Sequence, residues 1–414
     1  MTQWTPEWAV SINGAGDVTN LTLANLTITS GRTDIYSQPY AGYCNVEIIN
    51  LDQSPIVMDI NDQVTIKVKD STGAFVNIFG GFVSDIDVTV SDAGTNGISE
   101  RIRVIALGAL SKLPKSLTEG VLTKAFDGTQ IYTILSDLLL NNWNEVPPAE
   151  TWLDYDPTIT WANAENVGLG DIDRPGNYEL TARTTDLTNV YSLVSALATS
   201  GFGYIYEDSV GRIGYADSTH RADYLSTYGY TELTANTALA RGIRTVKRAG
   251  DVRNDVTIIY KANASKNAFD VQSQSIYGPQ QYQIITSLEL ALDAQEQADF
   301  YLGLRAFPQP QFKEITFPLA NGELDNSDRD TLLRVFMGLP LDIIDLPANI
   351  TNARFQGFVE GWTFQAGYNQ LNLTLTLSPT EYSIITTRWD RVNPAETWNT
   401  LSPTLQWIDA TIVA

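Results

Sequence analysis

Residues 371–377 read Leu371-Asn372-Leu373-Thr374-Leu375-Thr376-Leu377. Leucine alternates with a polar residue along the whole stretch, so an extended chain places all the leucines on one face and all the polar side chains on the other. A helix would instead spread these leucines around its axis. The stretch therefore predicts a strand of an antiparallel sheet with one buried face.

The same alternation recurs from residue 8 to about residue 106, broken by turn-forming Asp, Gly, Asn and Ser. The predicted strands are residues 21–23, 26–28, 64–68, 86–90 and 101–104. We expect these strands to form an antiparallel sheet that is closed, or nearly closed, into a barrel. Residues 1–112 are accordingly predicted to be a first, tube-like β-barrel domain.

Strands return after Arg241. They are predicted at residues 256–260, 283–286, 315–317 and 371–377, with one helix at about residues 293–305 that stops before Pro308. Residues 241–380 are therefore predicted to be a second β-barrel domain with one helix.

The segment between the two β regions has helical periodicity. Its first predicted helix places Ile131, Ile134, Leu135, Leu138 and Leu139 on one face, begins near Asp127 or Thr129, and ends at Asn141-Asn142. Its second predicted helix carries Leu187, Val190, Val194 and Leu197, and Gly201 stands where a left-handed cap would be needed. Residues 204–206 and 212–215 are typical of a hairpin. Residues 113–240 are thus predicted to be a mixed α/β region.

The expected fold is mainly β with an α+β middle: two tube-like antiparallel β-barrels plus a mixed region. A chain of 414 residues with 43% apolar residues can bury real cores. With 26 Lys and Arg against 48 Asp and Glu, the net charge is −22. This charge argues against tight binding of phosphate backbones as the main activity.

The single cysteine, Cys44, excludes an intrachain disulfide and lies in an apolar run, which indicates a buried thiol. Residues 1–8 have neither a basic segment nor an apolar core, and no later run approaches membrane-spanning length. We therefore expect a soluble protein made in the cytoplasm.

Two distant segments carry the same nine-residue unit of tryptophan and proline. The tryptophans are Trp143, Trp152, Trp161, Trp389, Trp398 and Trp407, and the prolines are Pro148, Pro157, Pro394 and Pro403. Over 19 positions from each first tryptophan, 10 are identical. A spacing of nine turns successive indoles to opposite sides of either regular element, and proline interrupts both. Each unit therefore predicts a short extended piece followed by a turn.

Three roles remain open for these ten residues. The indoles can cover an edge or core of their own domain, since most tryptophans are largely buried. They can dock on another chain, since tryptophan is enriched in binding hot spots. They can also stack on sugars. Residues 381–414 are treated as a Trp/Pro-rich docking tail.

The sequence offers no convincing catalytic or metal-binding group. His220 is the only histidine and lies in a polar run, which predicts a solvated loop side chain and leaves neither a catalytic triad nor a zinc site. Residues 323–330 are acidic but lack the pattern of a calcium loop, so they predict an acidic turn and a helix start. Carboxylate pairs suited to glycoside hydrolysis, Asp154 with Asp156 or Asp171 with Asp173, are a weak signal. We expect no enzyme activity, cofactor or metal.

Several short motifs, taken in order, resemble the hub or minor tail proteins of tailed bacteriophages with long flexible tails. In the first domain they are residues 30–34, 41–42, 62–64 and 79–85. In the last domain they are residues 254–256, 275–278, 294–298, 357–362 and 373–379, together with the Trp/Pro tail.

This resemblance implies a virion protein of the tail tip, or baseplate, that is assembled in the host cytoplasm. It implies a homotrimer whose two tube-like domains per chain form a six-domain ring around the channel for DNA ejection. The implied neighbours are a distal tail protein and the tail tube on one side, and tip or fibre proteins and a tape-measure protein on the other, with contact to the host envelope. DNA would pass without specific binding. The alternative is a carbohydrate- or receptor-binding tip protein that uses the Trp units.

Overall fold

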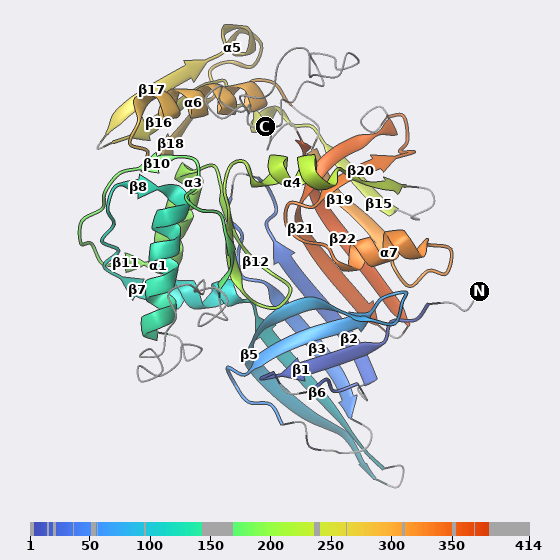
Figure 1. The fold of residues 1–414 in the computed structure, drawn as a ribbon. Helices are drawn as coiled ribbons and strands as arrows, with labels where there is room; N and C mark the ends of the chain where they lie inside the picture. The colour runs from blue at the N-terminus through green and yellow to red at the C-terminus, as the bar shows by residue number, and fades with distance from the viewer. Residues whose placement is uncertain are drawn as a thin grey trace.

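Two groups of β-strands, one from each end of the chain, join into one large sheet (Figure 1). The computed structural model describes residues 4–142 and 169–380, apart from short gaps at residues 15, 20–21, 36, 51–54, 56, 95–96, 236–240, 262, 309–310, 350–352 and 368. The sheet follows the order β1-β4-β5-β6-β3-β2-β21-β22-β19-β15, and the pair β14 and β20 attaches to β21.

The first group confirms the predicted antiparallel strands near the N-terminus. It comprises β1 (Trp8–Ile12), β2 (Thr22–Gly31), β3 (Tyr43–Asn50), β4 (Gln63–Lys69), β5 (Phe75–Gly94) and β6 (Gly97–Leu107). Buried and more exposed residues alternate along β3 and β4, as period-two hydrophobicity requires. Cys44 is fully buried in β3, as predicted.

The second group is formed by β14 (Thr231–Thr234), β15 (Arg241–Val246), β19 (Gln311–Pro318), β20 (Pro340–Ile344), β21 (Phe355–Gly367) and β22 (Gln370–Pro379). The alternating leucines of residues 371–377 lie in β22 and are buried, as predicted. Antiparallel pairing of β2 with β21 joins the two groups through six register pairs, from Leu26–Ala366 to Gly31–Gly361.

The antiparallel, mainly β architecture expected from the sequence is confirmed. The two expected barrels are not confirmed: their strands belong to one shared sheet, and no closed barrel is found among the described residues. Its end strands in the described part of the chain are β1 and β15, while β14 and β20 pair in parallel. The buried face of this sheet forms a single core, which runs from Val10 in β1 to Leu377 in β22.

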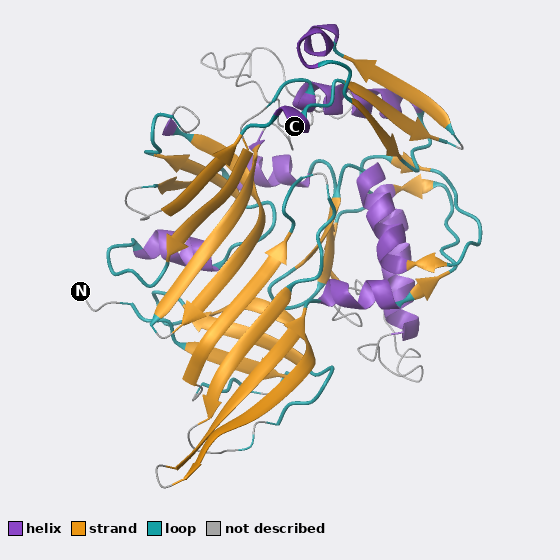
Figure 2. Cartoon of the chain, turned by 180° about the vertical axis from the view of Figure 1, so that it is seen from behind, coloured by secondary structure: helices purple, strands orange, loops and turns teal. Residues whose placement is uncertain are grey.

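The middle region lies beside this sheet and contains the predicted helices (Figure 2). Its elements are η1 (Ala109–Lys115), β7 (Leu117–Thr118), β8 (Ala125–Phe126), α1 (Asp127–Asn142), β9 (Leu169–Ile172), β10 (Glu179–Leu180), β11 (Thr188–Asn189), α3 (Val190–Ser200), β12 (Tyr204–Glu207), β13 (Ile213–Ala216) and α4 (His220–Tyr228). The hairpin prediction is confirmed, since β12 and β13 pair antiparallel.

Most of the remaining elements form a small unit of strands and helices. They are η3 (Ala249–Asp251), β16 (Asp255–Tyr260), β17 (Ala264–Phe269), α5 (Val271–Tyr277), β18 (Gln281–Ile285) and α6 (Ala291–Arg305). Helix α7 (Asn326–Leu333) instead packs on the large sheet, because its Leu332 and Leu333 belong to the core of that sheet. The sheet of β16–β18 and helix α6 share a second core with α1, α3 and β13, so residues 256–298 pack with the middle region.

The prediction of one helix within residues 241–380 is wrong, because α5, α6 and α7 all lie there. Helix α5 was not predicted because it is mostly polar and lacks an apolar stripe, and of α7 the sequence indicated only the start, within residues 323–330. Both begin at an aspartate cap: Asp270 accepts a hydrogen bond from the Ser273 backbone N–H, and Asp325 from that of Ser327. No helix in the described ranges is both long and apolar enough to span a membrane.

The seam between β2 and β21 predicts a strong effect of one added methyl group. A Cβ on Gly361 would lie 2.6 Å from the Arg32 carbonyl oxygen and 3.0 Å from the Arg32 backbone nitrogen. We expect Gly361→Ala to lower the free energy of unfolding by about 1–3 kcal/mol, as overpacking does. Urea unfolding followed by circular dichroism measures this change.

Gly367→Ala, on the same strand, is the matched control, because a Cβ there meets no atom within 4 Å. Equal stability of the two variants would contradict a close seam between the two strand groups.

Candidate functional site

One buried carboxylate binds side chains from three separate parts of the chain. Glu360 in β21 accepts a hydrogen bond from Arg32 Nε at 2.6 Å, and Arg32 directly follows β2. Two nitrogens of Arg221 in α4 donate to Glu360 at 2.7 and 3.0 Å. The Ser378 hydroxyl in β22 completes the cluster. The carboxylate therefore ties both strand groups and the middle region to one point.

Burial and aromatic contacts set the electrostatics of this cluster. Glu360 is 1% exposed, Arg221 3% and Arg32 7%. The Arg221 and Arg32 guanidiniums lie 4.6 and 5.2 Å from the centre of the Tyr204 ring. Burial alone would raise the pKa of Glu360, but the charges of Arg221 and Arg32 and the hydrogen bonds lower it to about 2.

A second carboxylate joins the middle region to the first strand group. Glu207, at the end of β12, accepts hydrogen bonds from the backbone N–H groups of Gly42 and Leu110. Burial raises its pKa to about 7. A Cβ on Gly42 or Gly108 would lie only 2.2 or 2.1 Å from this carboxylate, so an alanine at either position would have to displace the Glu207 side chain.

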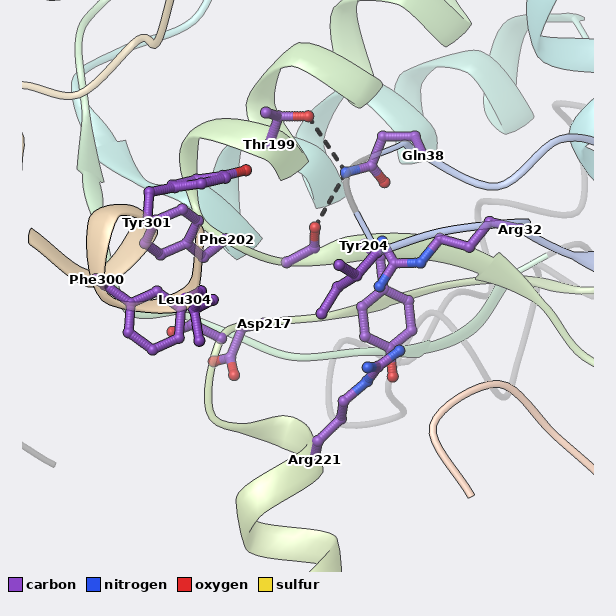
Figure 3. A pocket seen from close by; sticks show the side chains of 13 residues that line it. Arg32, Gln38, Thr199, Phe202, Tyr204, Asp217, Arg221, Phe300, Tyr301 and Leu304 are labelled. Atoms are coloured by element: carbon purple, nitrogen blue, oxygen red, sulfur yellow. Dashed lines mark hydrogen bonds between the residues drawn. The ribbon is translucent and has the colours of Figure 1, made fainter. Parts of the chain in front are cut away.

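A cavity of about 70 Å³ opens where these parts meet (Figure 3). One wall is cationic and contains Arg32 and Arg221. The opposite wall is apolar and contains Phe202 together with Phe300, Tyr301 and Leu304 of α6. The other residues that line the pocket are Ile35, Gln38, Thr199, Gly203, Tyr204, Asp217 and Ser218. The pocket therefore combines positive charge with an aromatic surface.

The aromatic wall includes a residue with an unfavourable backbone conformation. Phe202 has φ of +55°, which bulky residues rarely adopt. The prediction of a left-handed cap at Gly201 after α3 is wrong, because Gly201 has φ of −86°. Gly201 is needed for a different reason: a Cβ there would lie 2.4 Å from the buried Asp127 carboxylate.

His220 is not the solvated loop residue predicted from its polar surroundings. It is the first residue of α4, its side chain is 30% exposed, and its Nδ1 lies 2.8 Å from Asp173 Oδ2. Burial opposes protonation, but the hydrogen bond and charge of Asp173 raise the pKa of His220. Local polarity could not indicate this pair, because the two residues are separated by 47 positions.

The ten Trp and Pro residues named from the sequence all lie outside the described residues, and so do Asp154 and Asp156. Their roles therefore stay predictions. In the other carboxylate pair, Asp171 lies in β9 and Asp173 contacts His220. The acidic residues 323–330 form a turn and the start of α7, as predicted. Within the described ranges, no group of three or more His, Cys, Asp or Glu residues is placed to hold a metal ion.

The roles of Arg32, Arg221 and Glu360 were not predicted from the sequence. Arg32 and Glu360 lie within two short motifs, residues 30–34 and 357–362, on which the resemblance to tail proteins rests. A signal was available, because opposite charges at two distant points flanked by strand residues suggest a buried pair. Only the pairing of β2 with β21 brings them together.

Comparison with known proteins gives the class of fold. The sequence matches no known family model and no curated protein. Among solved structures, the 43 kDa tail protein of prophage MuSo2 from Shewanella oneidensis superposes with a TM-score of 0.53 at 11% identity, covering 91% of this chain and 99% of that one. A tail protein from Neisseria meningitidis MC58 superposes with a TM-score of 0.59 at 11% identity, covering 92% and 98%.

The structural neighbours of this chain are therefore phage tail proteins, and the likeness extends over almost the whole chain. The resemblance inferred from short motifs is confirmed at the level of the fold.

Removing the negative charge of Glu360 should destabilise the protein strongly and change how its free energy of unfolding depends on pH. We expect Glu360→Gln to lower the free energy of unfolding by about 3–5 kcal/mol, because two buried guanidiniums lose their anion. Since the pKa of Glu360 falls from 4.5 to about 2 on folding, its contribution is full above about pH 4.5 and disappears as pH falls toward 2. Urea unfolding at pH 7 and pH 3 measures both effects.

The control for this substitution is Glu47→Gln, which removes the exposed pair of Glu47 with Arg101. That change should cost less than about 1 kcal/mol. Similar losses in the two variants would contradict the central role of Glu360.

The His220 pair gives a prediction that one NMR resonance can test. Asp173→Asn should lower the pKa of His220, since the hydrogen-bonded anion that favours the imidazolium is lost. The titration is unambiguous because the chain contains one histidine. Asp223 lines the same surface cavity as Asp173 and His220. Asp223→Asn is therefore the control, and it should leave the pKa of His220 near its original value. An unchanged titration in Asp173→Asn would rule out the pair.

Proposed function

We propose that this protein is a structural hub of a bacteriophage tail, without catalytic activity. In this proposal three copies form a ring at the tail tip that joins the sixfold tail tube to threefold tip proteins and encloses the DNA exit channel. The observation that carries the proposal is a fold shared with two tail proteins over more than nine-tenths of the chain.

The shared sheet supports a ring built from two β units per chain. Strands β1–β6 form one unit, and β15, β19, β21 and β22 form most of the other. Their connection through β2 and β21 fixes the relative orientation of the two units. Three chains would then place six β units around an axis, and neighbouring copies would complete the two tube-like barrels expected from the sequence.

The polar face of the sheet suits a channel for DNA. Across the seam, Thr27 faces Gln365 and Thr29 faces Thr363. On the next strand pair, Thr363 faces Thr374 and Gln365 faces Asn372. Neutral hydroxyl and amide groups displace no counterions from phosphate, whereas unpaired Lys and Arg do. Arg101, on the same face of the first strand group, is paired with Glu47. We assign this face to the channel, past which DNA slides without specific binding.

The distribution of charge refines the role of the acidic composition. Residues 113–240 contain 17 acidic and 6 basic residues, whereas residues 241–380 contain 15 and 12. Half of the net charge of −22 thus lies in the middle region. In this proposal the channel face is nearly neutral, and the middle region supplies half of the net negative charge that keeps nucleic acid and other anions from adhering.

The Trp/Pro units are proposed as docking segments for neighbouring tail proteins. These neighbours are the distal tail protein and tail tube on one side and the tip or fibre proteins and tape-measure protein on the other. Large indoles on an irregular backbone give a small segment much contact area.

The proposal predicts a trimer and a separable docking tail. Light scattering should give a mass three times the chain mass of 45.6 kDa. A chain truncated after Thr387 should keep its melting temperature and its trimeric mass, yet enter particles at least tenfold less efficiently in a complementation assay.

A stable monomer that also binds glycans would contradict the hub and favour the carbohydrate- or receptor-binding alternative. A large fall in melting temperature on truncation would instead mean that the Trp units pack against their own chain.

A further inference from the structure

The pocket of Figure 3 has a cationic wall that is held in place before any ligand arrives. Arg32 and Arg221 both line it and are at least nine-tenths buried. Glu360 fixes their guanidiniums from behind, and Tyr204 lies between them in contact with both. Two cations thus share one carboxylate, and little side-chain freedom remains to be lost when an anion binds.

The remaining acidic residue of the pocket is already engaged elsewhere. Asp217 Oδ1 accepts hydrogen bonds from the backbone N–H of Thr219, the hydroxyl of Thr219 and the backbone N–H of His220. These bonds direct its carboxylate toward the start of α4. Asp217 therefore lines the pocket, but its carboxylate is bonded to the start of α4 and not to Arg32 or Arg221.

The opposite wall is suited to an apolar group. Phe202 packs against Phe300 and Tyr301, with ring centres 5.7 and 5.2 Å apart, and Leu304 extends the same surface. Phe202 takes its place there at the cost of a left-handed backbone. Such strain concentrates at functional positions, because folding alone does not favour it.

The size of the pocket limits the ligand. A cavity of about 70 Å³ has room for about five water-sized groups. That space can enclose a carboxylate with a few methylenes but cannot enclose a whole sugar ring or nucleotide. The polar end of such a ligand would meet the arginines, and its stem would lie along Phe202 and Leu304.

We propose that this pocket binds a carboxylate carried on a short apolar stem, supplied either by a small organic acid or by an acidic side chain of a neighbouring protein. Charge-assisted hydrogen bonds to the guanidiniums provide the selectivity for the anion. The aromatic wall removes the stem from water. The lining residues of this pocket include none of the residues assigned to the channel face.

Butyrate is the probe, and butyramide is its uncharged control of almost equal shape. Ligand-observed NMR on the full-length chain should give saturable binding of butyrate with a dissociation constant of about 1 mM, as expected for a ligand of this size. Butyramide should bind at least tenfold more weakly. Absence of butyrate binding, or equal binding of the two compounds, would overturn the proposal.

Variants that fill the cavity test its location without touching the arginines. Leu304→Phe and Ile35→Phe enlarge side chains on two different walls and should each reduce butyrate binding at least tenfold. Leu292→Phe makes the same change at an exposed position of the same helix and should bind butyrate normally. If both filled variants unfold at the same urea concentration as the parent and still bind butyrate, the pocket is not the site.

The source of the carboxylate is decided by particle assembly, and this arm alone rests on the proposed function. If Leu304→Phe loses butyrate binding but enters particles normally, the ligand is a free small acid. If it loses butyrate binding and is excluded from particles, the ligand is an acidic side chain of a neighbouring tail protein. Both outcomes support the binding site. If the unsubstituted chain itself does not enter particles, the proposed tail function is contradicted and the binding site is not.

Discussion

The arrangement of the molecule depends on one buried carboxylate that must neutralise two buried guanidiniums. Glu360 in β21 has 1% exposure, and its two partners come from the end of β2 and from α4. Leaving any one of these charges unpaired in the interior would cost several kcal/mol. The two strand groups and the middle region therefore have to reach their final positions together.

The pocket follows from the same constraint. The guanidiniums need Glu360 on one side and are flanked by Tyr204, so apolar side chains cannot close around them completely. The second core, which includes residues of α3 and α6, approaches from the opposite side and ends in Phe202 and Tyr301. An amphipathic gap remains where a charged cluster of the sheet meets an aromatic edge of the middle region.

Local sequence predicted most elements but little of what joins them. Alternating leucines gave β22, and helical periodicity gave α1, because each signal lies within one element. The pairing of β2 with β21 joins residues more than 300 positions apart, and a local periodic pattern cannot indicate such a pairing. His220 was wrongly predicted for the same reason, since its partner Asp173 is defined by tertiary contact. The fully buried Arg221 could not be recognised without the carboxylate that compensates it.

The six-pair seam between β2 and β21 also has a mechanical meaning. Hydrogen bonds in an antiparallel pair lie across the strands, so a pull along the strands loads many of them at once in shear. A pull across the strands would instead open them one after another. A chain with this seam resists tension along its strands far better than separation of its two halves. The ion cluster at Glu360 lies next to the Gly31–Gly361 end of the seam and stabilises that end against opening.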